Sequence, residues 1–164
     1  MTPEARLAAL GLTLPEPPRP HGDYQPVTVH GGIALVSGQL SREGDGVVRG
    51  PVGPATAPET LARAGRACTL RALSALRHEL GGLHAVERVL HLRGFVNAEP
   101  AFEEHSRVLD TVSRLLHDVF GERGRHARTA VGVSSLPSRG LLEIELTLAV
   151  ARRKARPACA GDSG

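Results

Sequence analysis

Apolar and polar residues alternate most regularly close to the C-terminal end of the chain. Over residues 141–150, every second position from Leu142 to Val150 is aliphatic, and Glu143 and Glu145 stand between these positions. A period of two predicts a β-strand that has one face in a hydrophobic core. The opposite face of this strand then carries two carboxylates among apolar neighbours.

Shorter apolar runs predict the rest of a sheet. Two of them are separated by Gly31-Gly32, a dipeptide that favours a tight hairpin. The sequence Pro-Ser-Arg-Gly at 137–140 predicts a turn, so we expect the last two strands to form a hairpin as well. The predicted strands are 27–30, 33–37, 86–96, 127–134 and 141–150.

Apolar residues recur at helical spacing in two long segments and one short one. The long helices are expected over 58–80 and 101–120, and each is followed by glycine, which commonly ends a helix. A short helix is expected after Thr2, because threonine is a good N-cap and a proline and an acid follow it. Several prolines then make an extended linker.

The element order β-β-α-β-α-β-β predicts an α+β fold in which two helices cover one face of an antiparallel sheet. The second face of the sheet is left uncovered, and packing such sheets around a threefold axis would bury it. We divide the chain into an N-terminal helix with a proline-rich linker (1–20), one domain (21–151) and a basic tail (152–164), which we expect to be disordered.

Composition adds a reason to expect an oligomer. Aromatic residues make up 2% of the chain, so the core must be built from aliphatic side chains, and a small core of this kind gains from association. The formal charge is +3, but part of it belongs to the basic tail and the rest of the chain is close to neutral. Nucleic acid is therefore not expected as a partner, because binding it usually needs a basic face.

Several classes of protein find no support in the sequence. No segment resembles a signal peptide or is apolar enough to cross a membrane, so we expect a cytoplasmic protein without membrane contact. The two cysteines form no CxxC pair, the histidines are scattered, and no phosphate-binding loop is present. Neither a metal nor an organic cofactor is therefore expected.

The last two predicted strands carry a candidate anion site. Arg128 shares one side of its strand with Ala130 and Gly132, and such small neighbours leave room for a ligand anion beside the guanidinium. A hairpin would place Arg128 and Glu143 on neighbouring strands. The simpler interpretation is a cross-strand ion pair, which contributes roughly a few tenths of a kcal/mol.

Four short motifs follow one another along the chain. They are Tyr24, the segment Leu35-Val36-Ser37-Gly38-Gln39-Leu40, the segment Ala127-Arg128-Thr129-Ala130-Val131-Gly132-Val133 with Leu136-Pro137, and Glu143-Ile144-Glu145. In this order they resemble the RidA/YjgF family, over roughly residues 18–150. The segment Gly124-Arg125-His126-Ala127-Arg128 further resembles a longer-chain branch of that family.

The resemblance implies a homotrimer of chorismate-mutase-like fold with ligand clefts between its subunits. It also implies the hydrolysis of reactive enamines and imines, derived from amino acids, to 2-keto acids and ammonia, without a metal or organic cofactor. Arg128 would hold the substrate carboxylate, and Glu143 would orient or deprotonate a water molecule. The cleft would be lined by Tyr24, Ser37 and Gly38, although Ser37 is equally well explained as a hydrogen-bonding serine at a strand end.

Two further positions expected at the substrate depart from the family pattern. Ala130 stands where many deaminating relatives have cysteine, and Asp110 stands where relatives of the longer branch often have asparagine. An acid facing the cleft would weaken the binding of a carboxylate. Two other functions stay open: a non-catalytic trimer that binds small carboxylates or has a regulatory role, and, with less support, a ribonuclease or RNA-binding protein.

Overall fold

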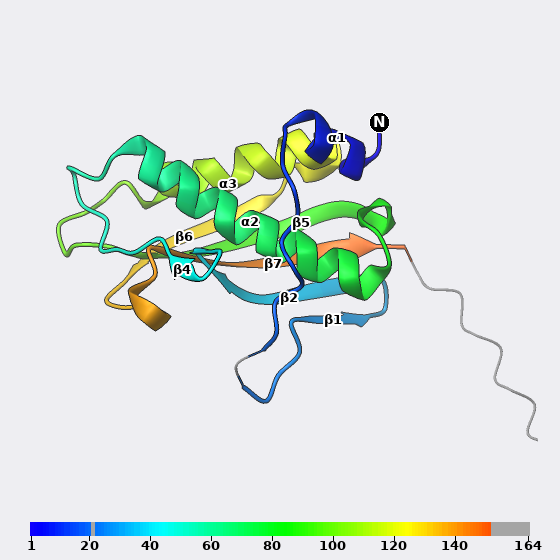
Figure 1. Ribbon diagram of the computed structural model, residues 1–164, viewed down its shortest axis with the longest axis horizontal. Helices are drawn as coiled ribbons and strands as arrows, with labels where there is room; N and C mark the ends of the chain where they lie inside the picture. Colours follow the sequence, from blue (N-terminus) through cyan, green and yellow to red (C-terminus); the bar gives the residue numbers. More distant parts are fainter. Residues whose placement is uncertain (21, 152–164) are drawn as a thin grey trace, which may run out of the picture.

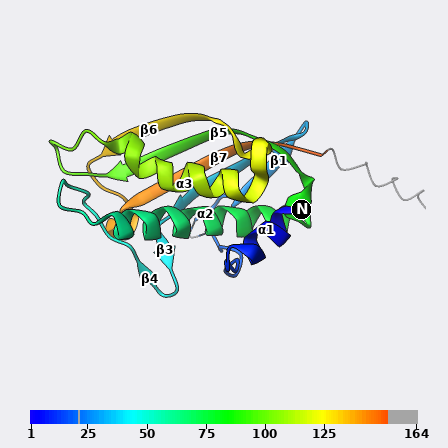
Figure 2. The same cartoon turned by 90° about the horizontal axis from the view of Figure 1, so that it is seen from above.

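The computed structural model describes residues 1–20 and 22–151, and it has two long helices side by side on one face of a five-stranded sheet (Figure 1, Figure 2). The sheet strands are β1 (Val27–His30), β2 (Ile33–Leu40), β5 (Val86–Asn97), β6 (Ala127–Val133) and β7 (Leu142–Val150), in the spatial order β1-β2-β7-β5-β6. The helices are α1 (Pro3–Ala9), α2 (Pro58–Leu80) and α3 (His105–Phe120), and a small second sheet pairs β3 (Arg42–Glu43) with β4 (Gly46–Val47). The α+β prediction, with both long helices on one face, is confirmed.

Most elements begin and end close to where the sequence pattern predicts. The first hairpin pairs β1 with β2 antiparallel around its two glycines, and α2 covers the expected segment. α3 begins at His105, later than the expected residue 101. The chain first makes a turn, in which the N–H of Phe102 donates to the carbonyl of Glu99 (3.0 Å).

The predicted hairpin of the last two strands is wrong. β6 and β7 both pair with β5, β6 in parallel and β7 antiparallel, so β5 separates them. Parallel neighbours need a crossover connection, and α3 supplies it between β5 and β6. Arg128 is aligned with Leu92, which is buried under the helices, whereas Glu143 is aligned with Phe95 on the uncovered face. Arg128 and Glu143 therefore lie on opposite faces of the sheet.

β7 lies at the centre of the sheet and supplies its most regular buried face. Cys68 of α2 is buried against it, and its Sγ donates to the carbonyl of Leu142 (3.3 Å). Burial also raises the pKa of the Cys68 thiol well above its usual value, as for a small residue of the core. The alternate side chains of β7 are at most 2% exposed: Leu142, Ile144, Leu146, Leu148 and Val150.

β5 is an irregular strand, because its register against β7 shifts twice, between Val86 and Arg88 and between Val89 and His91. Val89 is buried whereas Leu90 is 37% exposed. One extra residue in a strand exchanges the faces of the residues that follow it, so a single alternation does not describe the whole of β5.

A bulge interrupts β2 at Ser37-Gly38. Between Val36 and Gln39 the register shifts, so that two residues of β2 face one residue of β7. Bulges bend a strand, re-aim its side chains and often lie next to functional sites. β1 pairs only with the part of β2 before the bulge, so β1 leaves the outer edge of β2 uncovered from there on.

The N-terminal helix packs on the helical layer. The hydroxyl of Thr2 caps α1, as predicted, and Leu7 is 3% exposed. The carboxylate of Glu4 accepts a hydrogen bond from the N–H of Leu83 (2.7 Å). None of the helices in the described ranges is long and apolar enough to cross a membrane. The predicted basic tail (152–164) lies outside the residues that the structure describes.

Candidate functional site

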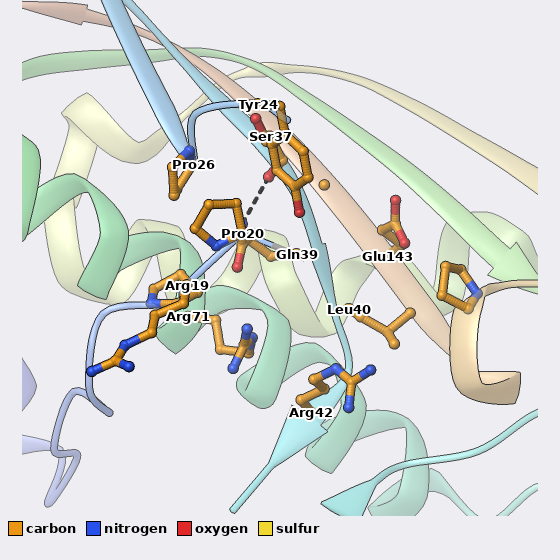
Figure 3. Close-up of a pocket in the computed structure, with 13 residues that line it drawn as sticks. Arg19, Pro20, Tyr24, Pro26, Ser37, Gln39, Leu40, Arg42, Arg71 and Glu143 are labelled. Atoms are coloured by element: carbon orange, nitrogen blue, oxygen red, sulfur yellow. Dashed lines mark hydrogen bonds between the residues drawn. The ribbon is translucent and has the colours of Figure 1, made fainter. Parts of the chain in front are cut away.

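A hollow of about 370 Å³ lies beside the bulge of β2. Its walls come from the proline-rich segment before β1, from the bulge, from α2 and from β7 (Figure 3). Ligand pockets commonly span roughly 300–1,000 Å³, so this volume suits a small metabolite. Four of the residues predicted from the sequence line the hollow together: Tyr24, Ser37, Gly38 and Glu143.

The bulge brings the backbone of β2 against the carboxylate of Glu143. A Cβ atom at Gly38 would collide with Oε1 of Glu143, so this close approach requires glycine. The hydroxyl of Ser37 donates to the carbonyl of Gln25 (2.6 Å), and its N–H donates to the carbonyl of Pro26 (2.9 Å). These bonds hold the linker against β2, and the Ser37 oxygen keeps lone pairs that can accept a hydrogen bond.

Glu143 is a half-buried carboxylate without a protein partner. It forms no ion pair and no side-chain hydrogen bond with the residues described here. Burial is the main cause that raises its pKa above the usual value, and repulsion from Glu145 adds to the shift. A carboxylate with a raised pKa is a stronger base when ionised and holds a proton more readily, as general acid–base catalysis requires.

Three arginines line the same hollow: Arg19 of the linker, Arg42 of β3 and Arg71 of α2. In Figure 3 their guanidinium groups lie apart from Glu143. Nε of Arg71 is buried and has no hydrogen-bond partner in the described ranges. Burial, and then repulsion from Arg42, lower the pKa of Arg71. No carboxylate among the described residues pairs with any of these arginines, so the hollow carries unneutralised positive charge.

The sequence analysis missed these arginines, although Arg71 gave a usable signal. The residues three and four positions before and after Arg71 share its side of the helix, and all four are buried. An arginine among such neighbours is unusual, because arginine is rarely buried without a partner. The four neighbours are Ala67, Cys68, Ser74 and Ala75.

The charged groups of the hollow favour the binding of an organic anion. These are three guanidinium groups and one carboxylate, whereas a metal cation would need several anionic or imidazole ligands. Within the described ranges, no group of three or more His, Cys, Asp or Glu side chains could hold a metal ion.

Arg128 lies outside this hollow. Its Nη1 donates to the carboxylate of Asp110 (2.8 Å) and to the hydroxyl of Ser113 (3.1 Å), and its Nη2 donates to the hydroxyl of Ser106 (2.6 Å). The predicted ion pair between Arg128 and Glu143 is wrong, because the side chain is directed at α3 and Asp110 is its partner. Within one chain Arg128 and Glu143 share no site, and the role of Arg128 as a carboxylate anchor stays a prediction.

The small residues beside Arg128 face α3 as well. A Cβ atom at Gly132 would collide with the ring of His105, so the sheet and α3 are in close contact here. His105 of α3 fills the space beside Gly132, and Arg128 lines a separate hollow of about 310 Å³ together with Arg114, Arg125 and His126. Ala130 and Asp110, both expected at the substrate, lie with Arg128 and not at the hollow.

A chain of hydrogen bonds continues from Arg128 through α3. Oγ of Ser113 lies 3.1 Å from Nε2 of His126, and Nδ1 of His126 lies 2.6 Å from the carbonyl of Gly124. A carbonyl can only accept, so Nδ1 carries the proton and Nε2 accepts from Ser113. Burial is the main cause that lowers the pKa of His126, which keeps the ring neutral near pH 7. The members of this cluster therefore satisfy one another's hydrogen bonds within the chain.

The chain matches the family described as YjgF/chorismate_mutase-like, putative endoribonuclease, over residues 4–148. Protein TCP17 of Trypanosoma cruzi is 39% identical over 143 residues, which are 86% of this chain and 89% of that protein. Among solved structures, protein Atu1372 of Agrobacterium tumefaciens, of unknown function, is 37% identical with a TM-score of 0.83, covering 92% of this chain and 94% of that one. A Shewanella oneidensis protein described as a putative endoribonuclease is 32% identical with a TM-score of 0.86, covering 92% and 100%.

These matches agree with the fold and with the motifs. The family match includes both long helices and nearly all of the sheet, from α1 into β7. The resemblance expected from the Ser-Gly-Gln and Glu-Ile-Glu motifs is confirmed, and so is the fold that it implied. The chain therefore belongs to the YjgF/chorismate-mutase-like family.

Proposed function

We propose that the hollow beside β2 hydrolyses enamines or imines of amino-acid origin to 2-keto acids and ammonia. The observation that carries this proposal is Glu143, an unpaired and half-buried carboxylate with a raised pKa, in one hollow with unpaired arginines. An imino acid offers a carboxylate for an arginine and an electrophilic carbon for an activated water. The hollow thus holds both an anchor and a base.

The proposed anchor is Arg71, with Arg42 next to it. A guanidinium binds a carboxylate through two parallel hydrogen bonds, and the buried Nε of Arg71 lacks a partner until an anion arrives. Arg128 is the less suitable anchor within one chain, because Asp110 already neutralises it at 2.8 Å. In this proposal Arg71, which the motifs did not identify, binds the substrate carboxylate in place of Arg128.

Glu143 moves protons in the proposed reaction. It takes a proton from a water molecule as the water oxygen bonds to the C=N carbon, and the π electrons pass to nitrogen, which gains a proton. In the resulting carbinolamine Glu143 takes the hydroxyl proton and passes it to the amino nitrogen, so the C–N bond breaks, ammonia leaves, and the C=O bond forms. The hydroxyl oxygen of Ser37 and that of Tyr24 line the same hollow and can orient the water.

A homotrimer belongs to the same proposal. The sheet face that the helices leave uncovered carries exposed aliphatic side chains: Ile33 at 38%, Leu35 at 51% and Val131 at 41%. Covering such a face removes apolar surface from water, which favours association. Light scattering at micromolar concentration is expected to give about three chain masses, and a clean monomer would contradict this part of the proposal.

The test is ammonia release from freshly generated 2-aminoacrylate and from imines of simple amino acids. Glu143→Gln is expected to lower kcat by about 100- to 10,000-fold, because proton transfer is lost while the anchor remains. The variant should still bind 2-ketobutyrate in calorimetry. Glu145→Gln is the matched control: it removes the neighbouring carboxylate of β7, which pairs with Arg93 (3.3 Å), and it should keep most of the activity.

Absence of turnover by the wild-type chain, above the rate in buffer, would contradict the deaminase proposal. If 2-ketobutyrate still binds and Arg71→Gln removes that binding, a non-catalytic carboxylate-binding protein takes its place. RNA cleavage that survives Glu143→Gln would point away from the hollow altogether, towards the activity named for the Shewanella relative.

A further inference from the structure

The arginine side of the hollow carries more charge than one carboxylate can neutralise. Arg42 and Arg71 are half-buried, and Arg19 is exposed at the rim. Among the described residues no carboxylate pairs with any of them, and the hydrogen bond from Arg42 goes to a neutral group, the hydroxyl of Ser138 (2.9 Å). Two partly desolvated cations therefore line one hollow, and repulsion from Arg42 contributes to the lowered pKa of Arg71.

A substrate with a single acidic group would neutralise only one of the two half-buried arginines. One guanidinium fork satisfies both oxygens of one carboxylate. The second half-buried guanidinium would then stay unpaired inside an occupied site, from which the ligand has expelled water. Unpaired charges away from water are costly, whereas a second acidic group on the ligand would offset that cost.

We propose that the hollow selects imino acids whose side chain carries a second acidic group, a carboxylate or a phosphate. This selection rests on the proposed deaminase function and names its substrate class. One acidic group binds Arg71 and the other binds Arg42, with Arg19 at the rim and the C=N carbon next to Glu143. A volume of about 370 Å³ has room for a four- or five-carbon dicarboxylate.

The preference for two acidic groups can be tested by measuring the binding of keto acids, without any catalytic turnover. Calorimetry on the full-length chain compares 2-ketobutyrate with 2-ketoglutarate and with 3-phosphohydroxypyruvate, which distinguish the carboxylate from the phosphate. The better of the two dianions is expected to bind about 10- to 100-fold more tightly, the effect of one additional charge-assisted contact. Arg42→Gln should abolish this preference. Arg63→Gln removes one charge from an exposed ion pair with Glu43 and should retain it.

Measurements of turnover then distinguish the proposed deaminase function from the proposed selection of substrates with two acidic groups. Imines of aspartate or glutamate should be hydrolysed with kcat/KM at least about 10-fold above imines of alanine, for the same reason. Equal binding of the three keto acids, with alanine-derived imine still hydrolysed, would overturn dianion selection and leave the deaminase function intact. Tight binding of a dianion without ammonia from any imine would overturn the deaminase function and support selection of dianions by a binding protein.

Discussion

Arg71 of α2 and Arg128 of β6 are both partly buried arginines, and they differ in the hydrogen-bond partners that surround them. Arg128 donates to a carboxylate and to two hydroxyl groups, so its charge and its fork of donors are satisfied within the chain. Arg71 has a buried Nε without a partner in the described ranges, and a second arginine nearby. The donors of Arg128 thus have partners within the chain, whereas Arg71 keeps a donor and a charge with which an anion can pair.

The comparison shows that residue type alone does not identify an anion site. Arginine suits a carboxylate ligand in both places, but a guanidinium that is already paired must give up its partner before it can bind a substrate. The charge that remains unpaired in the folded chain is the better guide.

The largest difference is expected in catalysis. Arg71→Gln should lower kcat/KM by about 30- to 1,000-fold, as expected for a lost bidentate contact worth roughly 2–4 kcal/mol. Arg128→Gln should change it by less than about 3-fold once the protein is folded, because a structural residue does not contact the substrate. Steady-state ammonia release measures both.

The opposite ranking would restore Arg128 as the anchor, with its site completed by a neighbouring subunit. In that case Arg128→Lys should impair the reaction almost as much as Arg128→Ala, because lysine provides a point charge and not a fork.

Gly38→Ala tests how closely the bulge must approach Glu143. The added methyl group would displace the carboxylate, and a misplaced base should lower kcat by about 10- to 100-fold with little change in the binding of 2-ketobutyrate. Gly46→Ala is the control, because a methyl group there would have only ordinary contacts. Wild-type kcat in the Gly38 variant would show that Glu143 is not the base.

Stability should respond in the opposite sense at the two arginines. Asp110→Ala leaves Arg128 without its carboxylate and is expected to cost about 1–3 kcal/mol in urea denaturation. Arg71→Met removes a partly desolvated charge and should be neutral or stabilising without ligand. Glu104→Ala, which breaks only an exposed pair with Arg107, should change stability by less than about 0.5 kcal/mol. A similar loss in Asp110→Ala and in this control would remove the structural role of Arg128.

The smallest effect concerns the pH dependence of stability at Glu143. Because burial raises its pKa in the folded chain, the folded state holds this proton more tightly, and folding is penalised as the pH rises through the folded pKa. Glu143→Gln should therefore raise Tm by about 1–3 °C at pH 8 and by less at about pH 3, where Glu143 is protonated in both the folded and the unfolded wild type. Scanning calorimetry at the two pH values measures this, and an equal shift at both would contradict it.

The period of apolar residues was enough to predict most of the elements and the buried face of β7. Such local patterns fix which side chains share a face, because the geometry of a strand or helix repeats over a few residues. The motifs that resemble the RidA/YjgF family, and not the periodicity, located Tyr24, Ser37, Gly38 and Glu143, which line one hollow. The register shift at Ser37-Gly38 gives the Ser-Gly motif a structural reason that sequence matching could not supply.

The pairing of the strands could not be predicted from the local pattern of apolar residues. Two consecutive strands joined by a turn favour a hairpin, but here β5 takes the position between them, because long-range packing under α3 competes with the local turn. The prediction that Arg128 lies beside Glu143 was wrong because it assumed that β6 and β7 are neighbouring strands. Arg42 and Arg71 were missed for a related reason: their position at the hollow depends on elements distant in sequence.

The central position of β7 has a consequence for how the chain is made. β7 is synthesised after the other four strands of its sheet, yet it joins β2 on one side and β5 on the other, and the pair Ile33–Ala149 spans most of the chain. Until β7 emerges from the ribosome, the sheet exists as two separate pairs with open inner edges. Pairing between strands so distant in sequence is slow to form, and until it forms the open edges are exposed to pairing with other chains.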